Sequence, residues 1–111
     1  FNHGGRFVNI HHARMRLGCS KLRSNLYHNV CAVDDPFCQC GNGSEDPYHF
    51  FFICPRYTQQ RVILLNELSD CVPRLSLLLF GNMDLPVHEN IAIFEHVHRF
   101  IVDTGRFSAN M

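Results

Sequence analysis

Charged residues are scarce in this sequence, and the charges cancel. Lysine and arginine number 10, aspartate and glutamate also number 10, and charged residues make up only 18% of the 111 residues. This balance excludes an acidic tail and a strongly basic arm. Every apolar run is short, so the sequence lacks the stretch of about 20 apolar residues that a membrane-spanning helix needs. We therefore expect no membrane partner.

Signals for β-strands are nearly absent as well. No run alternates between apolar and polar residues, and no Asn-Gly turn separates two apolar stretches. Hydrophobic residues nevertheless make up 46% of the sequence, which is enough for a core in a chain of ordinary domain size. We predict an all-α fold in which four or five helices surround a small loop, with residues 1–111 forming one domain.

Two helices are predicted in the first third of the chain. Ile10, Ala13 and Leu17 recur at helical spacing and form an apolar stripe. Ser20 is suited to cap a second helix, in which apolar residues again recur with the helical period. The apolar residues of this second helix are Leu22, Leu26 and Val30. We interpret residues 1–33 as a basic helical hairpin.

Three further helices are predicted toward the C-terminus, and together they make residues 58–111 a helical remainder. The first begins near Pro55 and ends before Pro73, and the second is a short buried helix over residues 74–80. The last helix begins at Pro86. Its apolar stripe, ended by Gly105, consists of Ile91, Phe94, Val97, His98 and Ile101.

Cysteine and histidine are abundant, with 6 and 8 residues respectively, and several of them fall in one short segment. The pattern there is Cys38-x-Cys40-x8-His49-x4-Cys54. Three thiolates and one imidazole are a common ligand set of structural zinc sites. The gap between the first two cysteines is one residue tighter than usual, but Gly41 and Gly43 permit the sharp turn that this gap requires. We interpret residues 36–57 as a zinc loop.

The local sequence also favours convergence of the last two ligands. Asp46 and Pro47 are suited to begin a short helix that carries His49. On an unbroken helix, His49 and Cys54 would lie about 140° apart. Pro55 removes this obstacle because it disfavours the helical conformation at Cys54. The predicted ligands of one zinc ion are Cys38, Cys40, His49 and Cys54.

Disulfide bonds are the alternative for these cysteines, since six is an even number. Small secreted domains use disulfides because they lack a core, which this chain does not. Cys38 and Cys40 are also too close in sequence to pair well with each other. We expect Cys19, Cys31 and Cys71 to be small core residues, and Cys31 is the one that could compete as a ligand.

Charge is distributed unevenly along the chain although the total is zero. Residues 1–33 contain five basic residues and no acidic residue, whereas the other five basic residues and all ten acidic residues follow. The two parts therefore carry +5 and −5, which favours a basic face. Arginine suits both phosphate contact and base stacking. The predicted nucleic-acid-binding residues are Arg14, Arg16, Lys21 and Arg23. The alternative is a solvated helix face.

Two motifs of this sequence carry a family resemblance. The first is Arg14-x-Arg16-x-Gly18-x-Ser20-x-Leu22, and the second combines Cys38-x-Cys40-Gly41, His49-Phe50 and Cys54-Pro55 with Tyr57. Together they resemble the C-terminal zinc-binding segment of non-LTR (LINE-type) retrotransposon reverse transcriptases. The resemblance covers about half of the chain. It implies a zinc-stabilised module that helps an RNA-directed DNA polymerase to hold template RNA or target DNA, in the nucleus and cytoplasm.

We expect no catalytic site in this segment. Asp34 and Asp35 lack the aromatic residue that precedes the paired aspartates of polymerases, because Ala32 stands in its place. His88 lacks the second histidine of a metalloprotease helix. The resemblance implies a reverse transcriptase domain upstream, so we expect the chain to be a piece of a larger protein. The alternative function is a zinc-stabilised protein-interaction module with no nucleic-acid role, which the zero net charge and the apolar last helices favour.

Overall fold

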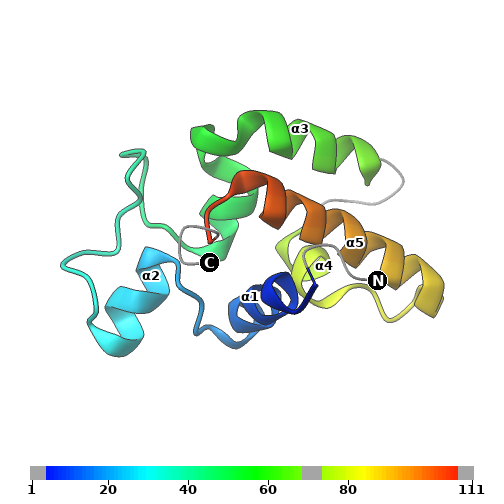
Figure 1. Ribbon diagram of the computed structural model, residues 1–111, viewed down its shortest axis with the longest axis horizontal. Helices are drawn as coiled ribbons and strands as arrows, with labels where there is room; N and C mark the ends of the chain where they lie inside the picture. The colour runs from blue at the N-terminus through cyan, green and yellow to red at the C-terminus, as the bar shows by residue number, and fades with distance from the viewer. Residues whose placement is uncertain (1–4, 69–73, 108–111) are drawn as a thin grey trace.

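The computed structural model describes residues 5–68 and 74–107, and all regular structure in these ranges is helical (Figure 1). The main helices are α1 (Gly5–Leu17), α3 (Thr58–Glu67), α4 (Leu75–Phe80) and α5 (Val87–Thr104). The shorter ones are α2 (Arg23–Asn25), the π-helical turns η1 (Leu26–Val30) and η2 (His49–Ile53), and the 3₁₀ turn η3 (Pro55–Tyr57). The predicted all-α fold is confirmed. None of the helices in these ranges is long and apolar enough to cross a membrane.

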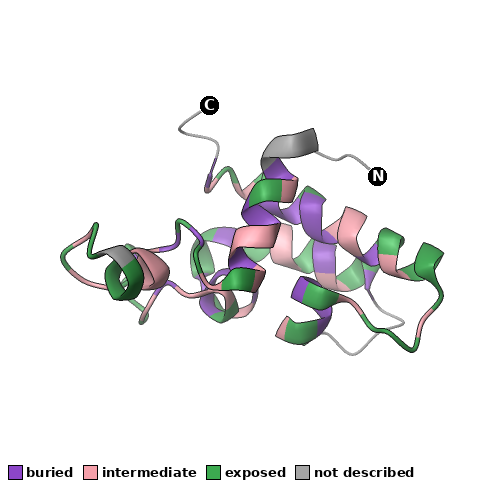
Figure 2. Cartoon of the chain, turned by 90° about the horizontal axis from the view of Figure 1, so that it is seen from below, coloured by how far each residue is buried: buried purple, intermediate pink, exposed green. Residues whose placement is uncertain are grey.

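Helix α5 occupies the middle of the arrangement. It contacts α3 on one side and α1 and α4 on the other (Figure 1). Helix α2 and the loop after it form one end of an elongated molecule that measures 42 × 26 × 25 Å. Figure 2 shows that buried residues gather where α5 meets its neighbours, whereas the end formed by α2 is largely exposed or half-buried.

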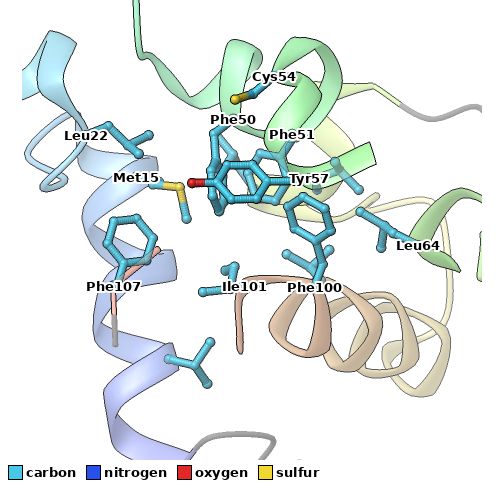
Figure 3. Close-up of a cluster of buried hydrophobic side chains, with 14 of the residues drawn as sticks. Met15, Leu22, Phe50, Phe51, Cys54, Tyr57, Leu64, Phe100, Ile101 and Phe107 are labelled. Atoms are coloured by element: carbon cyan, nitrogen blue, oxygen red, sulfur yellow. The ribbon is translucent and has the colours of Figure 1, made fainter. Parts of the chain in front are cut away.

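The core is built around the aromatic ring of Phe50 in η2 (Figure 3). Its centroid lies 5.1 Å from that of Phe51, 5.4 Å from those of Tyr57 and Phe100, and 5.7 Å from that of Phe107. The rings meet edge to face or tilted, which are the arrangements that their quadrupoles favour. This cluster joins η2 and η3 to α5 and to the segment that follows α5.

The apolar stripe predicted for the first helix is wrong. Ile10 and Leu17 are 40% and 78% exposed. The buried face of α1 instead carries Val8, His11, His12 and Met15. Two histidines therefore occupy positions that the apolar pattern did not assign to the core.

Both histidines of α1 are buried because each has a suitable partner. The Nε2 of His12 lies 2.7 Å from the carbonyl oxygen of Leu78 and donates to it, and its Nδ1 accepts from the Nε2 of His98 at 2.9 Å. The ring of His11 stacks on Phe107 with a centroid distance of 4.4 Å. Burial lowers the pKa of both histidines, that of His12 to about 4, so both rings are neutral at pH 7.

Helix α1 also completes the end of α4. As predicted, α4 ends at Phe80, and the φ of the next residue, Gly81, is 74°. The last carbonyl groups of a helix have no donor within it. Here His12 donates to Leu78, and the Arg16 guanidinium donates to the carbonyl oxygen of Leu79 at 3.2 Å. Side chains of α1 thus hold the short helix in place.

The predicted role of Ser20 as a helix cap is wrong. Helix α2 begins at Arg23, and the backbone N–H of Arg23 donates to the carboxylate of Glu45 at 2.8 Å. The Ser20 hydroxyl instead accepts from the N–H of Leu22 at 3.3 Å and donates to the side chain of Asn25. A carboxylate that is distant in sequence therefore replaces the local cap.

The remaining helix boundaries agree with the sequence. Pro55 opens η3, which leads into α3, and the expected stop before Pro73 lies outside the described residues. Pro86 precedes α5, and Gly105 ends it with a φ of 66°. Most of the predicted stripe of α5 is buried, but Ile91 is exposed.

We expect the stability of the protein to fall between about pH 6.5 and pH 4. The folded-state pKa of His12, about 4, lies below the unfolded value of 6.5. The stabilisation that neutral His12 provides is therefore complete above pH 6.5 and is lost as the pH falls. Replacing His12→Gln should reduce the pH slope of the unfolding free energy by up to about 1.4 kcal/mol per pH unit.

Urea unfolding of the parent and of the His12→Gln variant between pH 7 and pH 5 measures this slope. Histidines that do not contact His12, His49 included, contribute equally to both proteins and cancel in the difference, whereas His98, which is hydrogen-bonded to His12, is measured together with it. His88→Gln, which removes a histidine at an exposed position, is the matched control. Equal slopes in all three proteins would show that His12 does not titrate as proposed.

Candidate metal centre and neighbouring basic cavity

The four predicted metal ligands converge in the structure. One ligand atom from each of Cys38, Cys40, His49 and Cys54 lies within 4.8 Å of all the others. The Sγ atoms of Cys38 and Cys54 are 3.8 Å apart, and the Sγ of Cys40 lies 3.3 Å from the Nε2 of His49. Two sulfurs bound to one tetrahedral zinc at about 2.3 Å would be about 3.8 Å apart. The geometry of the group therefore fits a zinc ion.

The described cysteines form no disulfide bonds, since all five are free thiols. A sulfur–sulfur distance of 3.8 Å between Cys38 and Cys54 is far longer than a disulfide bond of about 2.05 Å. Cys19 and Cys31 are exposed, so the prediction that they are core residues is wrong. Cys19 follows Gly18, whose φ is 73°, and Cys31 itself has a φ of 51°. Cys71 lies outside the described residues.

The first two ligands are held by a tight loop. The N–H of Cys38 donates to the carbonyl oxygen of Gly43 at 2.7 Å, and the N–H of Gly41 donates to that of Cys38 at 3.0 Å. Gly41 and Gly43 have φ values of 85° and 113°, which few other residues adopt without strain. The predicted role of the two glycines is confirmed, because they let Cys38 and Cys40 face the same point.

The last two ligands are brought together by a π-helical turn. Asp46 caps the turn, since its carboxylate accepts the N–H of His49 at 2.7 Å. The N–H of Cys54 then donates to the carbonyl oxygen of His49 at 2.9 Å. This bond joins residues five apart, so both fall on one side of the turn. Cys54 itself is extended, with ψ 120°, as expected before Pro55. The proline break was predicted, but the wide turn was not.

Arg61 closes the end of this turn from helix α3. Its guanidinium donates to the carbonyl oxygens of Phe51 at 2.8 Å and Cys54 at 2.7 Å. Phe51 lies in η2, and Cys54 directly follows this turn. No pattern in the sequence indicates this function of Arg61. The bonds fix the backbone that presents Cys54.

Arg56 lies directly beside the metal ligands. Its Nε is 3.3 Å from the Sγ of Cys54, and its Nη2 is 3.1 Å from the Sγ of Cys38. Burial raises the pKa of Cys38 to about 11. Burial also acts on Cys54, but hydrogen bonds from Arg56 outweigh it and lower the pKa of this thiol. Three thiolates around a Zn²⁺ ion would carry one net negative charge, which the Arg56 guanidinium would balance.

Arg56 also connects the metal ligands to the buried carboxylate of Glu45. Only 2% of this side chain is exposed, and it accepts from the Nη2 of Arg56 at 3.0 Å. Two nitrogens of Arg106 each donate to it at 2.8 Å. Burial would raise the pKa of Glu45, but the bonds from Arg106 and from the N–H of Arg23 outweigh it, so the pKa is lowered. No pattern in the sequence distinguished Glu45 or Arg106.

A cavity of about 560 Å³ lies next to this network. We call it the basic cavity, because its charged lining consists of Lys21, Arg23, Arg56, Arg106 and Glu45. Two of the predicted nucleic-acid-binding residues, Lys21 and Arg23, are thus placed beside two arginines that are distant in sequence.

The predicted nucleic-acid-binding residues do not all share one environment. Arg14 and Lys21 lie close enough to His11 to lower its pKa further, after burial, and Arg106 does the same. Arg23 forms an ion pair with Asp35 at 3.3 Å. Arg16 instead faces α4 and lies over the ring of Phe94, 5.8 Å from its centroid. The binding role of these residues remains a prediction.

Comparison of the chain with protein-family models, curated protein sequences and solved structures found no match. The structure by itself defines a small helical protein with a Cys3His group that could hold a metal ion. Any more specific function has to be argued from the residues of the site.

We expect one zinc ion per chain, bound by this group. Cys54→Ser should abolish stoichiometric zinc binding, because a hydroxyl is a poor replacement for a thiolate ligand. Elemental analysis combined with thiol titration measures the effect. Cys31→Ser, which removes an exposed thiol outside the group, is the control and should retain the metal. Equal zinc contents in the two variants would rule out the proposed ligand set.

We also expect Arg56 to strengthen metal binding without touching the metal. Replacing Arg56→Ala removes both N–H···S bonds, and the loss of such supporting contacts typically weakens metal affinity by about 10- to 100-fold. Competition with a chromophoric chelator measures the affinity. Arg56→Lys keeps the charge and should lose less. The control Arg74→Ala removes an exposed arginine and should bind zinc as the parent does. An Arg56→Ala variant of parental affinity would contradict this assignment.

Proposed function

We propose that this chain is a zinc-stabilised accessory nucleic-acid-binding domain from the C-terminal end of a LINE-type reverse transcriptase. The observation that carries the proposal is the continuous set of hydrogen bonds from the ligand sulfurs through Arg56 to Glu45 and Arg106. Through it, a metal bound by the Cys3His group would brace the basic residues at the end of the molecule. The motifs that resemble the reverse transcriptases support the family assignment.

In this proposal the role of zinc is structural. Four protein ligands complete a tetrahedral shell and leave no position open for substrate or water. Three of the four side chains are buried, and Cys40 is half-buried. Zinc supplies cross-linking energy to the loop when bound, so its binding is part of the folding energy of the domain. The chain's own residues provide the charge balance and the orientation.

Nucleic-acid binding would come from basic side chains that residues 36–57, called the metal loop below, hold in position. Lysine and arginine contact phosphate groups irrespective of sequence, and arginine also stacks on bases. The total charge of the chain is zero, so we expect weak and salt-sensitive binding. Template RNA or target DNA and the upstream reverse transcriptase domain are the proposed partners.

We assign no catalytic function to this segment. The carboxylate of Asp35 accepts from the N–H of Phe37 at 3.0 Å and pairs with Arg23. The first of these contacts is typical of a turn residue that begins a loop. A polymerase metal site needs several carboxylates directed at one point, whereas the carboxylate of Asp35 is directed into its own turn.

A protein-interaction module is the second candidate function. Helix α3 exposes Val62 and Ile63 by 53% and 51%, and neighbouring exposed apolar residues favour contact with another protein. The two candidates differ in a direct measurement. Only the first predicts that the zinc-loaded chain binds RNA or DNA.

Fluorescence anisotropy with single-stranded RNA and single-stranded DNA at low and moderate salt tests the proposal. We expect binding at low salt that weakens as salt rises. The variant Arg14→Ala with Lys21→Ala should bind more weakly, and its salt dependence should fall by about one unit of slope per lost phosphate contact. Arg16 is kept because it holds the end of α4.

Arg74→Ala is the control for the loss of a basic side chain elsewhere, since Arg74 is exposed and lies outside the first third of the chain. It should bind as the parent does. Zinc content and thermal stability should be the same in all three proteins. If the parent binds neither nucleic acid at low salt, the protein-interaction module becomes the better hypothesis.

A further inference from the structure

We propose that the basic cavity is a binding site for a phosphate group, and that its natural ligand is a backbone phosphate of single-stranded nucleic acid. The inference rests on the proposed function and makes it more specific. The basic residues of the cavity come from three separate parts of the chain: Lys21 and Arg23 from the start of α2, Arg56 from η3, and Arg106 from the segment after α5. The cavity therefore differs from the predicted basic helical hairpin of residues 1–33, because Arg56 and Arg106 also line it.

The charges around the cavity favour an anion. Lys21, Arg23, Arg56 and Arg106 contribute four positive charges, and the lining contains one carboxylate, that of Glu45. The ion pair of Arg23 with Asp35 offsets one further charge, which leaves two positive charges. A zinc-bound Cys3His group would add one negative charge beside Arg56. An excess of one positive charge remains, which one phosphodiester group would neutralise.

The lining residues retain hydrogen-bond donors for such a ligand. Glu45 engages the Nη2 of Arg56 and the Nε and Nη2 of Arg106, so the Nη1 groups of both arginines take no part in these bonds. The buried Nε–H of Arg23 has no acceptor among the described residues. The exposed ammonium of Lys21 forms no ion pair within the described part of the chain.

The buried carboxylate also fixes these donors in space. Arg106 is held by two parallel N–H···O bonds of 2.8 Å, the forked geometry that gives arginine its directional specificity. Arg56 is held by Glu45 and by two sulfurs. A guanidinium that is already ordered loses less conformational entropy when a ligand binds. Glu45 thus acts as a positioning residue for the two arginines.

The size and the remaining lining indicate a phosphate that carries an organic group. The volume of about 560 Å³ falls within the range of about 300 to 1,000 Å³ that is usual for sites of small organic ligands. Leu26, Val33 and Tyr57 contribute apolar surface to the same cavity. A bare phosphate ion would leave most of this surface uncovered, whereas a nucleotide unit would contact both the charged and the apolar parts.

Titrations of the zinc-loaded chain followed by NMR of the backbone amides and arginine Nε–H groups test the inference. The probes are inorganic phosphate, a nucleoside monophosphate and a short single-stranded RNA, each at constant ionic strength. We expect all three to shift the signals of Arg23, Arg56 and Arg106, with the RNA binding tightest. Lys21→Glu should weaken each interaction by at least about threefold.

Arg74→Glu is the matched control, because it makes the same change of charge at an exposed position outside the lining of the cavity. It should affect phosphate binding less than Lys21→Glu does. Equal effects of the two substitutions would indicate general electrostatic attraction and would overturn the site. Zinc content is measured in both variants to confirm that the metal loop is intact.

The outcomes separate this inference from the proposed function. RNA binding that leaves the cavity signals unchanged would overturn the phosphate site while the proposed function stands. Binding of phosphate or nucleotide in the cavity without RNA binding would overturn the proposed function and its nucleic-acid ligand, and would leave a site for a small phosphorylated molecule. If no probe binds, both are wrong.

Discussion

The buried carboxylate of Glu45 is the contact on which the arrangement of the metal loop depends. It receives the backbone N–H of Arg23, the guanidinium of Arg56 and two nitrogens of Arg106. These donors come from the start of α2, from η3 and from the segment after α5. A buried charge that loses its partners is strongly destabilising, so this carboxylate holds these parts of the chain together.

The η2 turn explains why the metal group and the core depend on each other. His49 and Cys54 lie at its two ends and face the ligand cluster, whereas Phe50 and Phe51 between them pack against Phe100 (Figure 3). A wider turn or a straight helix would move both groups at once. Metal binding and burial of the aromatic rings are therefore expected to be coupled parts of one folding transition.

The sequence predicted the features that depend on neighbouring residues. Two glycines permit a sharp loop, Asp46 caps a turn and Pro55 ends it, and each of these effects acts within a few residues. The features it missed depend on distant contacts. Nothing near Glu45 indicates that Arg106 will bury it.

Helix α1 shows the same limit in its apolar pattern. Its buried face includes His12 because Leu78 and His98 provide hydrogen-bond partners, and these partners come from two other helices. Hydrophobic periodicity does not identify a polar side chain whose hydrogen-bond partners lie on other helices. It therefore assigned Ile10 and Leu17 to the buried face of α1, although both are exposed. Burial of a histidine depends on its partners as well as its spacing.

Folding rearranges the charges that are separated along the sequence. In sequence, the first third is basic and without acids. In the structure, Arg23 is paired with Asp35, Arg16 is directed to α4, and Arg106 from the end of the chain joins Lys21 at the cavity. The basic surface is therefore a product of tertiary contacts and does not coincide with one segment. Because Arg56 contacts both the sulfurs of Cys38 and Cys54 and the carboxylate of Glu45, the Cys3His group and that surface share one set of hydrogen bonds.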